Sequence, residues 1–175
     1  MDILISSNLE RLLYHITNDA TKVKSYMEKL QSTGCYQVDE ATLKAIQETF
    51  SAGYLDDSAT KKCIHDIYQQ DNYVADTHTA VAWQVAQDYQ KSTQDKTPMI
   101  ILSTASPYKF SDSVLSALGE DISNKDEFAL LDKLSTLNKD KIPQGLAQLQ
   151  SLPILHNNLC AKEDMIKAVN TFLNI

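Results

Sequence analysis

The sequence predicts a mostly α-helical chain that carries one or two β-strands, too few to form a sheet of their own. Only four of the 175 residues are glycine, and most segments place apolar residues three or four positions apart, as amphipathic helices do. The run Pro98–Leu102 is short, apolar and uncharged, which is typical of a buried strand. Met1–Ile5 is a second candidate because isoleucines alternate there. Because a strand has to pair, we expect the partner strands to lie outside this sequence.

Helix-capping residues and apolar spacing predict the helices in chain order. Ser7 or Asn8 can cap the first helix, and Gly34 follows the second, where a left-handed glycine commonly ends a helix. Thr77–Thr93 is the longest periodic stretch. The predicted helices span approximately residues 9–16, 19–32, 40–52, 58–68, 77–93, 111–118, 125–137, 144–149 and 162–173.

The composition excludes several classes of protein. A formal net charge of −7 argues against nucleic acid or an anionic membrane as a partner, since both require clustered lysine and arginine. No apolar run approaches the length of a membrane span, and the first residues lack the pattern of a signal peptide, so we expect a cytoplasmic protein. The isolated histidines and the widely spaced Cys35, Cys63 and Cys160 predict no metal site, and we expect reduced thiols.

Three strings of residues, in this order, carry a family resemblance. They are Met1-Asp-Ile-Leu-Ile-Ser-Ser-Asn-Leu-Glu-Arg-Leu-Leu, Asp76-Thr-His-Thr-Ala-Val-Ala and Ser103-Thr-Ala-Ser-Pro-Tyr-Lys-Phe. Together they resemble the carboxyl-terminal part of the longer microbial form of threonine synthase, and a weaker similarity continues to the end of the chain. One departure is Thr77, where the family usually has proline, although threonine can cap a helix there instead.

The resemblance implies an α/β, type II pyridoxal-phosphate fold for the parent enzyme, which converts O-phosphohomoserine and water to threonine and phosphate. In that family the cofactor forms a Schiff base with a lysine in a Ser-Phe-Lys-Asp string, and its phosphate lies in a glycine-rich loop. Neither string occurs in this sequence. We therefore expect residues 1–175 to form a single domain, the carboxyl-terminal portion of the enzyme. We expect this portion to be inactive by itself, to bind no cofactor alone and to have the amino-terminal part of the same enzyme as its partner.

The same strings suggest residues for the site. The resemblance places the hydroxyl of Thr104, alone or shared with Ser103, against the pyridine nitrogen of the cofactor, because a hydroxyl can donate to an unprotonated ring nitrogen. Lys109, the basic residue beside this turn, and the pair Asn8 and Arg11, one helical turn apart, are candidates for binding the substrate phosphate or carboxylate. The alternatives are that the hydroxyls only cap a loop, that Lys109 is a solvated lysine, and that Arg11 forms a surface salt bridge.

His78 is a candidate general base because imidazole titrates near neutral pH. We favour a structural role for it, since Asp76 and Thr79 have the side chains expected at a helix start. A second hypothesis for the whole chain is a stand-alone helical interaction or regulatory module derived from the same scaffold. A reading frame upstream of Met1 that encodes the lysine and the glycine-rich loop would favour the enzyme over the module.

Overall fold

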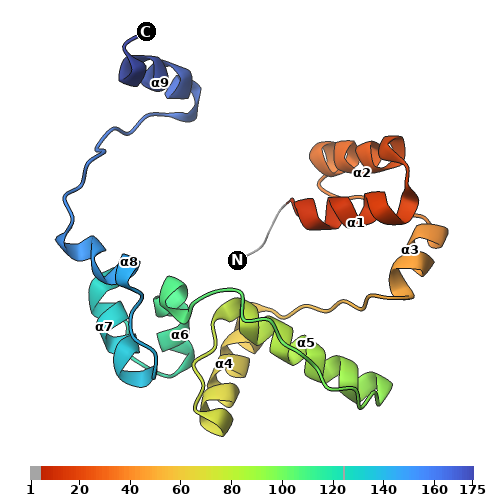
Figure 1. Cartoon of the computed structure of the whole chain (residues 1–175), viewed down its shortest axis with the longest axis horizontal. Helices are drawn as coiled ribbons and strands as arrows, with labels where there is room; N and C mark the ends of the chain where they lie inside the picture. The colour runs from red at the N-terminus through yellow and green to blue at the C-terminus, as the bar shows by residue number, and fades with distance from the viewer. Residues whose placement is uncertain (1–4, 124) are drawn as a thin grey trace. The chain divides into compact units, whose positions relative to one another are not determined.

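Helices account for every regular element that the structure describes. The computed structural model describes residues 5–123 and 125–175 (Figure 1). Its α-helices are α1 (Ser7–Thr17), α2 (Ala20–Thr33), α3 (Glu40–Gln47), α4 (Asp57–Asp71), α5 (Thr77–Thr93), α6 (Ser111–Ala117), α7 (Glu127–Leu137), α8 (Gln144–Ala147) and α9 (Met165–Leu173). Short 3₁₀ helices are η1 (Pro107–Phe110), η2 (Leu149–Ser151) and η3 (Lys162–Asp164). The predicted helical character is confirmed, and α5 has the predicted bounds.

The strand predicted at residues 98–102 is wrong. This segment is irregular, and no β-ladder occurs in the described ranges. A strand needs a neighbour about 4.8 Å away that exchanges backbone hydrogen bonds with it, and the described residues offer none. Its apolar side chains consequently face solvent, with Ile100 87% and Leu102 71% exposed. Of the second candidate strand, Met1–Ile5, residues 1–4 lie outside the described residues.

Contacts within the chain define two compact units, which we describe separately. Unit 1 comprises the residues up to Asp56 together with Val81–Ile101, and unit 2 comprises Asp57–Ala80 and Leu102–Ile175. The expectation that residues 1–175 form a single domain stays a prediction.

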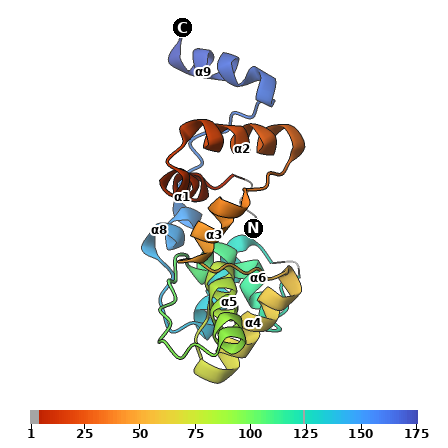
Figure 2. The same ribbon diagram turned by 90° about the vertical axis from the view of Figure 1, so that its right-hand side faces the viewer.

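In unit 1, α1 and α2 form a helical hairpin, and α3 packs against α1 (Figures 1 and 2). Ser6 rather than the predicted Ser7 or Asn8 caps α1, because its side chain accepts the amide of Leu9. Leu13, Val23 and Tyr26 form the buried core of this hairpin. Apolar faces at helical spacing therefore bring the first two helices together, as the sequence pattern predicts.

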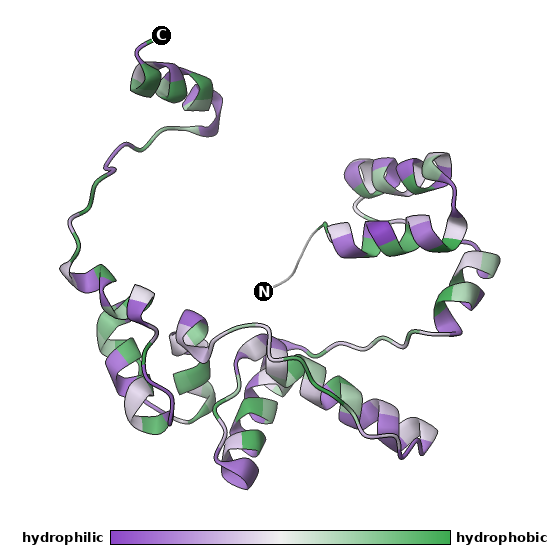
Figure 3. Cartoon of the chain, in the orientation of Figure 1, coloured by the Kyte–Doolittle hydropathy of each residue, from purple (hydrophilic) through white to green (hydrophobic). Residues whose placement is uncertain are grey.

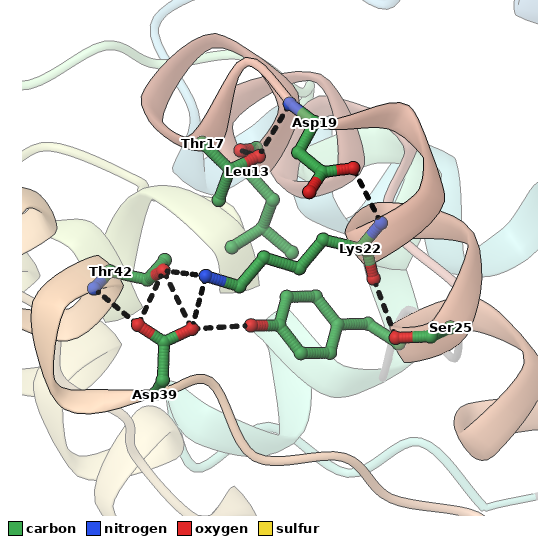
Figure 4. Close-up of polar contacts among 8 residues, drawn as sticks. Leu13, Thr17, Asp19, Lys22, Ser25, Asp39 and Thr42 are labelled. Atoms are coloured by element: carbon green, nitrogen blue, oxygen red, sulfur yellow. Dashed lines mark hydrogen bonds and ion pairs between the residues drawn. The ribbon is translucent and has the colours of Figure 1, made fainter.

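A polar network around Asp39 joins α2 to the start of α3 (Figure 4). The Asp39 carboxylate caps α3 by accepting the amide of Thr42 at 3.0 Å. It also accepts the hydroxyl of Tyr26 at 3.0 Å and lies 2.5 Å from the Lys22 ammonium. The Lys22 hydrogen bond, followed by that of the Thr42 amide, holds the pKa of Asp39 well below its usual range, and the same pair raises the pKa of Lys22.

Two glycines of unit 1 occupy positions where a side chain would be unfavourable. Gly34 ends α2 with a φ of 77°, and its amide bonds to the carbonyl of Leu30 at 2.9 Å. At Gly53 the backbone approaches α5 closely, because a Cβ there would lie 2.9 Å from Cγ1 of Val85. The first glycine is needed for its conformation and the second for space.

Unit 2 is organised around α6, which packs against α4, α7 and η1. Its core consists of buried side chains from these helices, chiefly Cys63, Ile64, Ile67, Val114, Leu115, Leu130, Leu131 and Leu134. The thiol of Cys63 donates to the carbonyl of Ala80 at 3.3 Å. Because Ala80 belongs to the first turn of α5, this contact ties the start of α5 to the core of unit 2.

Candidate functional site

The carboxylate of Asp76, which is 1% exposed, organises the first turn of α5. Its Oδ1 accepts the backbone N–H of His78 at 2.8 Å and that of Thr79 at 3.2 Å. Its Oδ2 accepts the hydroxyl of Thr79. Since the first amides of a helix lack an acceptor within the helix, Asp76 rather than Thr77 is the cap. Thr77 is the first helical residue, the position at which proline is well tolerated.

Two of the strings that carry the family resemblance meet at this turn. Oγ of Ser103 lies 3.1 Å from Oγ1 of Thr79 and 3.2 Å from the hydroxyl of Tyr73. The ring of His78 packs on the ring of Phe110 with a centroid separation of 5.1 Å. We call Tyr73, Thr79 and Ser103, together with Asp76, the hydroxyl cluster.

The Thr79 hydroxyl links Asp76 to Ser103 in the hydroxyl cluster. A carboxylate only accepts, and Thr79 has a single hydroxyl proton, so Thr79 donates that proton to Asp76. The same hydroxyl contacts Oγ of Ser103, and the Tyr73 hydroxyl contacts that Oγ as well, so Ser103 has two hydroxyl partners within the fold. The neighbouring Thr104 is exposed to solvent.

Lys109 lies in η1, five residues after Thr104. Ser106 starts this turn by accepting the amides of Tyr108 through Oγ at 3.3 Å and of Lys109 through its carbonyl at 3.0 Å. Tyr108 is buried and donates its hydroxyl to the carbonyl of Asp140 at 2.6 Å. Burial raises the pKa of Tyr108, which keeps this donor protonated. The turn is thus anchored while the Lys109 side chain is exposed.

Asn8 and Arg11 belong to unit 1, whereas Ser103, Thr104 and Lys109 belong to unit 2. On α1, Nη2 of Arg11 donates to Oδ1 of Asn8, so the two side chains lie together as their spacing predicts. Arg11 also lines a hollow of about 520 Å³ between α1 and α2, where further charged residues are Glu10 and Lys24. Their contact with substrate stays a prediction.

One member of the hydroxyl cluster, Tyr73, is absent from the residues that the sequence analysis predicts for the site. The chain has eight tyrosines, and no local pattern distinguishes one that meets a serine 30 residues away. Asp76 and Thr79 do carry a signal, since an aspartate before a helix and a threonine three residues later are typical of a capped start.

Two further kinds of site are not found in the part of the chain that the structure describes. No group of three or more His, Cys, Asp or Glu side chains could hold a metal ion there. No described helix is both long and apolar enough to cross a lipid bilayer.

Comparison with known proteins decides the family. Residues 79–169, about half of the chain, match the sequence model of the family described as "Threonine synthase, C-terminal". The chain belongs to the threonine synthase family. The matched region of this threonine synthase family member includes Thr79 and the whole string from Ser103 to Phe110.

Relatives and solved structures from the threonine synthase family are considerably longer than this chain. The threonine synthase of Saccharomyces cerevisiae is 32% identical over 171 residues, an alignment that covers 87% of this chain and 30% of the yeast protein. Human "Threonine synthase-like 1" is 34% identical over 163 residues, covering 91% of this chain and 20% of its own. The crystal structure of pyridoxal-phosphate-bound threonine synthase from Brucella melitensis superposes with a TM-score of 0.69 at 30% identity, over 99% of this chain and 32% of that one. The yeast structure gives a TM-score of 0.66, covering 87% and 31%.

Proposed function

We propose that this chain forms the carboxyl-terminal part of a threonine synthase, the pyridoxal-phosphate lyase that converts O-phosphohomoserine and water to threonine and phosphate. The observation that carries the proposal is the hydroxyl cluster, which anchors the Ser103–Thr104 pair within the region that matches the family. The chain spans about a third of the Brucella protein, so most of an enzyme of that size would be supplied by other residues. By itself the chain is inactive on this proposal.

The residues present fit one edge of the cofactor. The exposed Thr104 offers a neutral hydroxyl that can donate to the pyridine nitrogen, and the anchored Ser103 fixes the backbone beside it. Bound pyridoxal phosphate supplies an electron sink for the bond changes in the substrate. The lysine and glycine-rich strings that hold the rest of the cofactor in the family do not occur in this sequence. Cofactor binding therefore requires residues beyond these 175.

Binding of the substrate phosphate falls to exposed cations. Lys109 follows the hydroxyl pair in the anchored η1 turn and carries a charge that suits a phosphate. Arg11, oriented by its bond to Asn8, presents the remaining donors of its guanidinium fork. In this proposal these residues bind the substrate and take no part in proton transfer.

The test is a chimaera in which this chain replaces the matching third of the Brucella melitensis threonine synthase. We expect it to release phosphate from O-phosphohomoserine, and the chain alone with added cofactor to release none. Thr104→Val should lower kcat about 100-fold, as loss of a single well-placed donor does. Ser103→Ala should cost less than about tenfold, because its hydroxyl is already engaged with Thr79 and Tyr73. Thr136→Val is the matched control, since this exposed hydroxyl bonds only within α7, to the Lys133 carbonyl at 2.7 Å.

Each part of the proposal has its own contradicting result. Threonine formation by the chain alone would overturn its inactivity. Equal rates for the Thr104→Val and Thr136→Val chimaeras would remove Thr104 from the cofactor site. An equally large loss for Ser103→Ala would contradict the assignment of the cofactor contact to Thr104 rather than Ser103.

A second candidate function is a helical interaction or regulatory module built on the same scaffold. The exposed apolar residues at positions 98–102 favour it, because such surfaces commonly bind other proteins. A chimaera that folds and binds pyridoxal phosphate but releases no phosphate from the substrate would support the module over the enzyme.

A further inference from the structure

Helix α9 presents a continuous apolar stripe to solvent. The stripe consists of Met165, Ile166, Val169, Phe172 and Leu173, each more than half exposed, and we call it the α9 face. These positions recur at the spacing of one side of a helix. Figure 3 shows the hydrophobic colour along α9. A stripe of this kind normally packs against another element.

Unit 2 buries a comparable stripe elsewhere. On α7, Leu130, Leu131 and Leu134 are all buried against the other helices of the unit. The α9 face and the stripe on α7 therefore have a similar spacing of apolar residues, but only the stripe on α7 is covered by other helices. The fold covers apolar helix faces where elements of this chain are available.

The segment that leads into α9 shares this exposure. Leu152, Ile154, Leu155 and Leu159 each expose more than half of their surface. The ring of His156 packs edge-on against the ring of Phe172 with a centroid separation of 6.5 Å. This segment therefore contacts the α9 face at one residue. Exposed apolar surface thus continues from residue 152 through α9.

We infer that the α9 face is a docking surface for the remaining two thirds of a threonine synthase chain. This inference rests on the proposed function. The Brucella structure matches 99% of this chain, which includes α9, and this match uses only 32% of that protein. A nine-residue helix is marginal in isolation, because helices shorter than about 12–15 residues are barely stable in water. Its order therefore calls for a covering element, and a large part of the longer relative is available to supply one.

The size of the α9 face argues against a second copy of the chain as the occupant. A helix of nine residues is about 14 Å long. A stable interface between two proteins buries about 800 Å² on each partner, more than one stripe of this length offers. Docking within one polypeptide has no such requirement, because the linkage already brings the two surfaces together.

The experiment compares paired substitutions in two contexts, the chain alone and the chimaera with the first two thirds of the Brucella melitensis enzyme. The face pair is Ile166→Asp with Phe172→Asp. The control pair is Lys167→Asp with Thr171→Asp, exposed positions on the opposite side of α9. The unfolding equilibrium constant is measured in urea by circular dichroism, which requires no catalytic activity.

We expect the face pair to raise the unfolding constant of the chimaera at least about 100-fold, because two apolar side chains lose their burial. In the chain alone, where the α9 face is already exposed, the same pair should change it less than about threefold. The control pair should have a small effect in both contexts. The inference is overturned if the face pair acts equally in both contexts or has no effect in the chimaera.

Sedimentation tests whether a second copy of the chain occupies the α9 face. A wild-type chain that forms dimers which the face pair dissociates would identify a second copy and overturn the inference. The proposed function fails in a different way. If the face pair destabilises the chimaera, but the chimaera without these substitutions releases no phosphate, the docking surface stands and the catalytic proposal is rejected.

Discussion

The buried cap at the start of α5 allows a sharp prediction for Asp76→Ala. This change removes the acceptor of the His78 and Thr79 amides and of the Thr79 hydroxyl. Loss of a helix cap costs about 0.5–2 kcal/mol. A buried hydroxyl deprived of its acceptor adds about 1–3 kcal/mol. We therefore expect the free energy of unfolding to fall by about 1.5–5 kcal/mol, summing these two ranges.

The assay is urea unfolding followed by circular dichroism and by the fluorescence of Trp83, the single tryptophan, which lies in α5. With a denaturant slope near 2 kcal/mol per molar, the midpoint should fall by about 0.8–2.5 M. Asp126→Ala is the matched control. The exposed Asp126 caps α7 by accepting the amide of Ala129 at 2.8 Å, so only the cost of a cap, about 1 kcal/mol, is expected.

Equal losses for Asp76→Ala and Asp126→Ala would refute the reasoning, because they would show that burial of the hydroxyl cluster adds nothing to the cap. Asp76→Asn provides a second check. It keeps an acceptor for the helix amides, so we expect it to be less destabilising than Asp76→Ala. An equal or larger loss would show that the charge, rather than the acceptor, holds this turn.

Two further predictions concern the core of unit 2 and the Asp39 network of unit 1. Leu134→Ala should lower the free energy of unfolding by about 2–5 kcal/mol because the side chain is fully buried on α7, whereas Leu149→Ala, half exposed, should cost less than about 1 kcal/mol in the same urea assay; similar costs would contradict the packing of α7. The pKa of Asp39 is lower in the folded chain than in the unfolded chain. The stabilising contribution of this carboxylate is therefore present above its unfolded-state pKa of about 4 and is lost as the pH falls through its folded-state pKa. The temperature of the unfolding midpoint should thus decrease as the pH is lowered below about 4, and it should decrease less in Asp39→Asn than in the wild type. Equal decreases in the two proteins would contradict the role of the Lys22–Asp39 pair.

Local chemistry explains which elements could be predicted from the sequence. Helix α5 has the predicted bounds because a polar start precedes a long amphipathic stretch, and Gly34 ends α2 in the left-handed conformation expected of it. Helix α3 ends at Gln47, before the predicted end near Gly53. Beyond it the amide of Thr49 donates to the carbonyl of Ile46, three residues back, at 3.1 Å, which is the tighter 3₁₀ pattern common at helix ends.

Tertiary partners explain what the sequence could not provide. A run such as 98–102 has the composition of a strand, but pairing requires a neighbour that the described residues do not supply. The same holds for the site. The pair Ser103 and Thr104 could be predicted from one string, whereas the contact of Ser103 with Tyr73 spans 30 residues. Spacing along the chain carries no information on such a meeting.

The irregular segment at residues 98–102 has a consequence for how the chain behaves at different concentrations. Its apolar side chains are exposed, and extended apolar segments with free backbone groups pair readily with one another. Joined in one polypeptide, this segment and a partner strand meet at an effective concentration on the order of millimolar. As separate chains they meet only at their bulk concentration, and pairing between two copies then competes. Covalent linkage, more than affinity, would decide which strand this segment finds first.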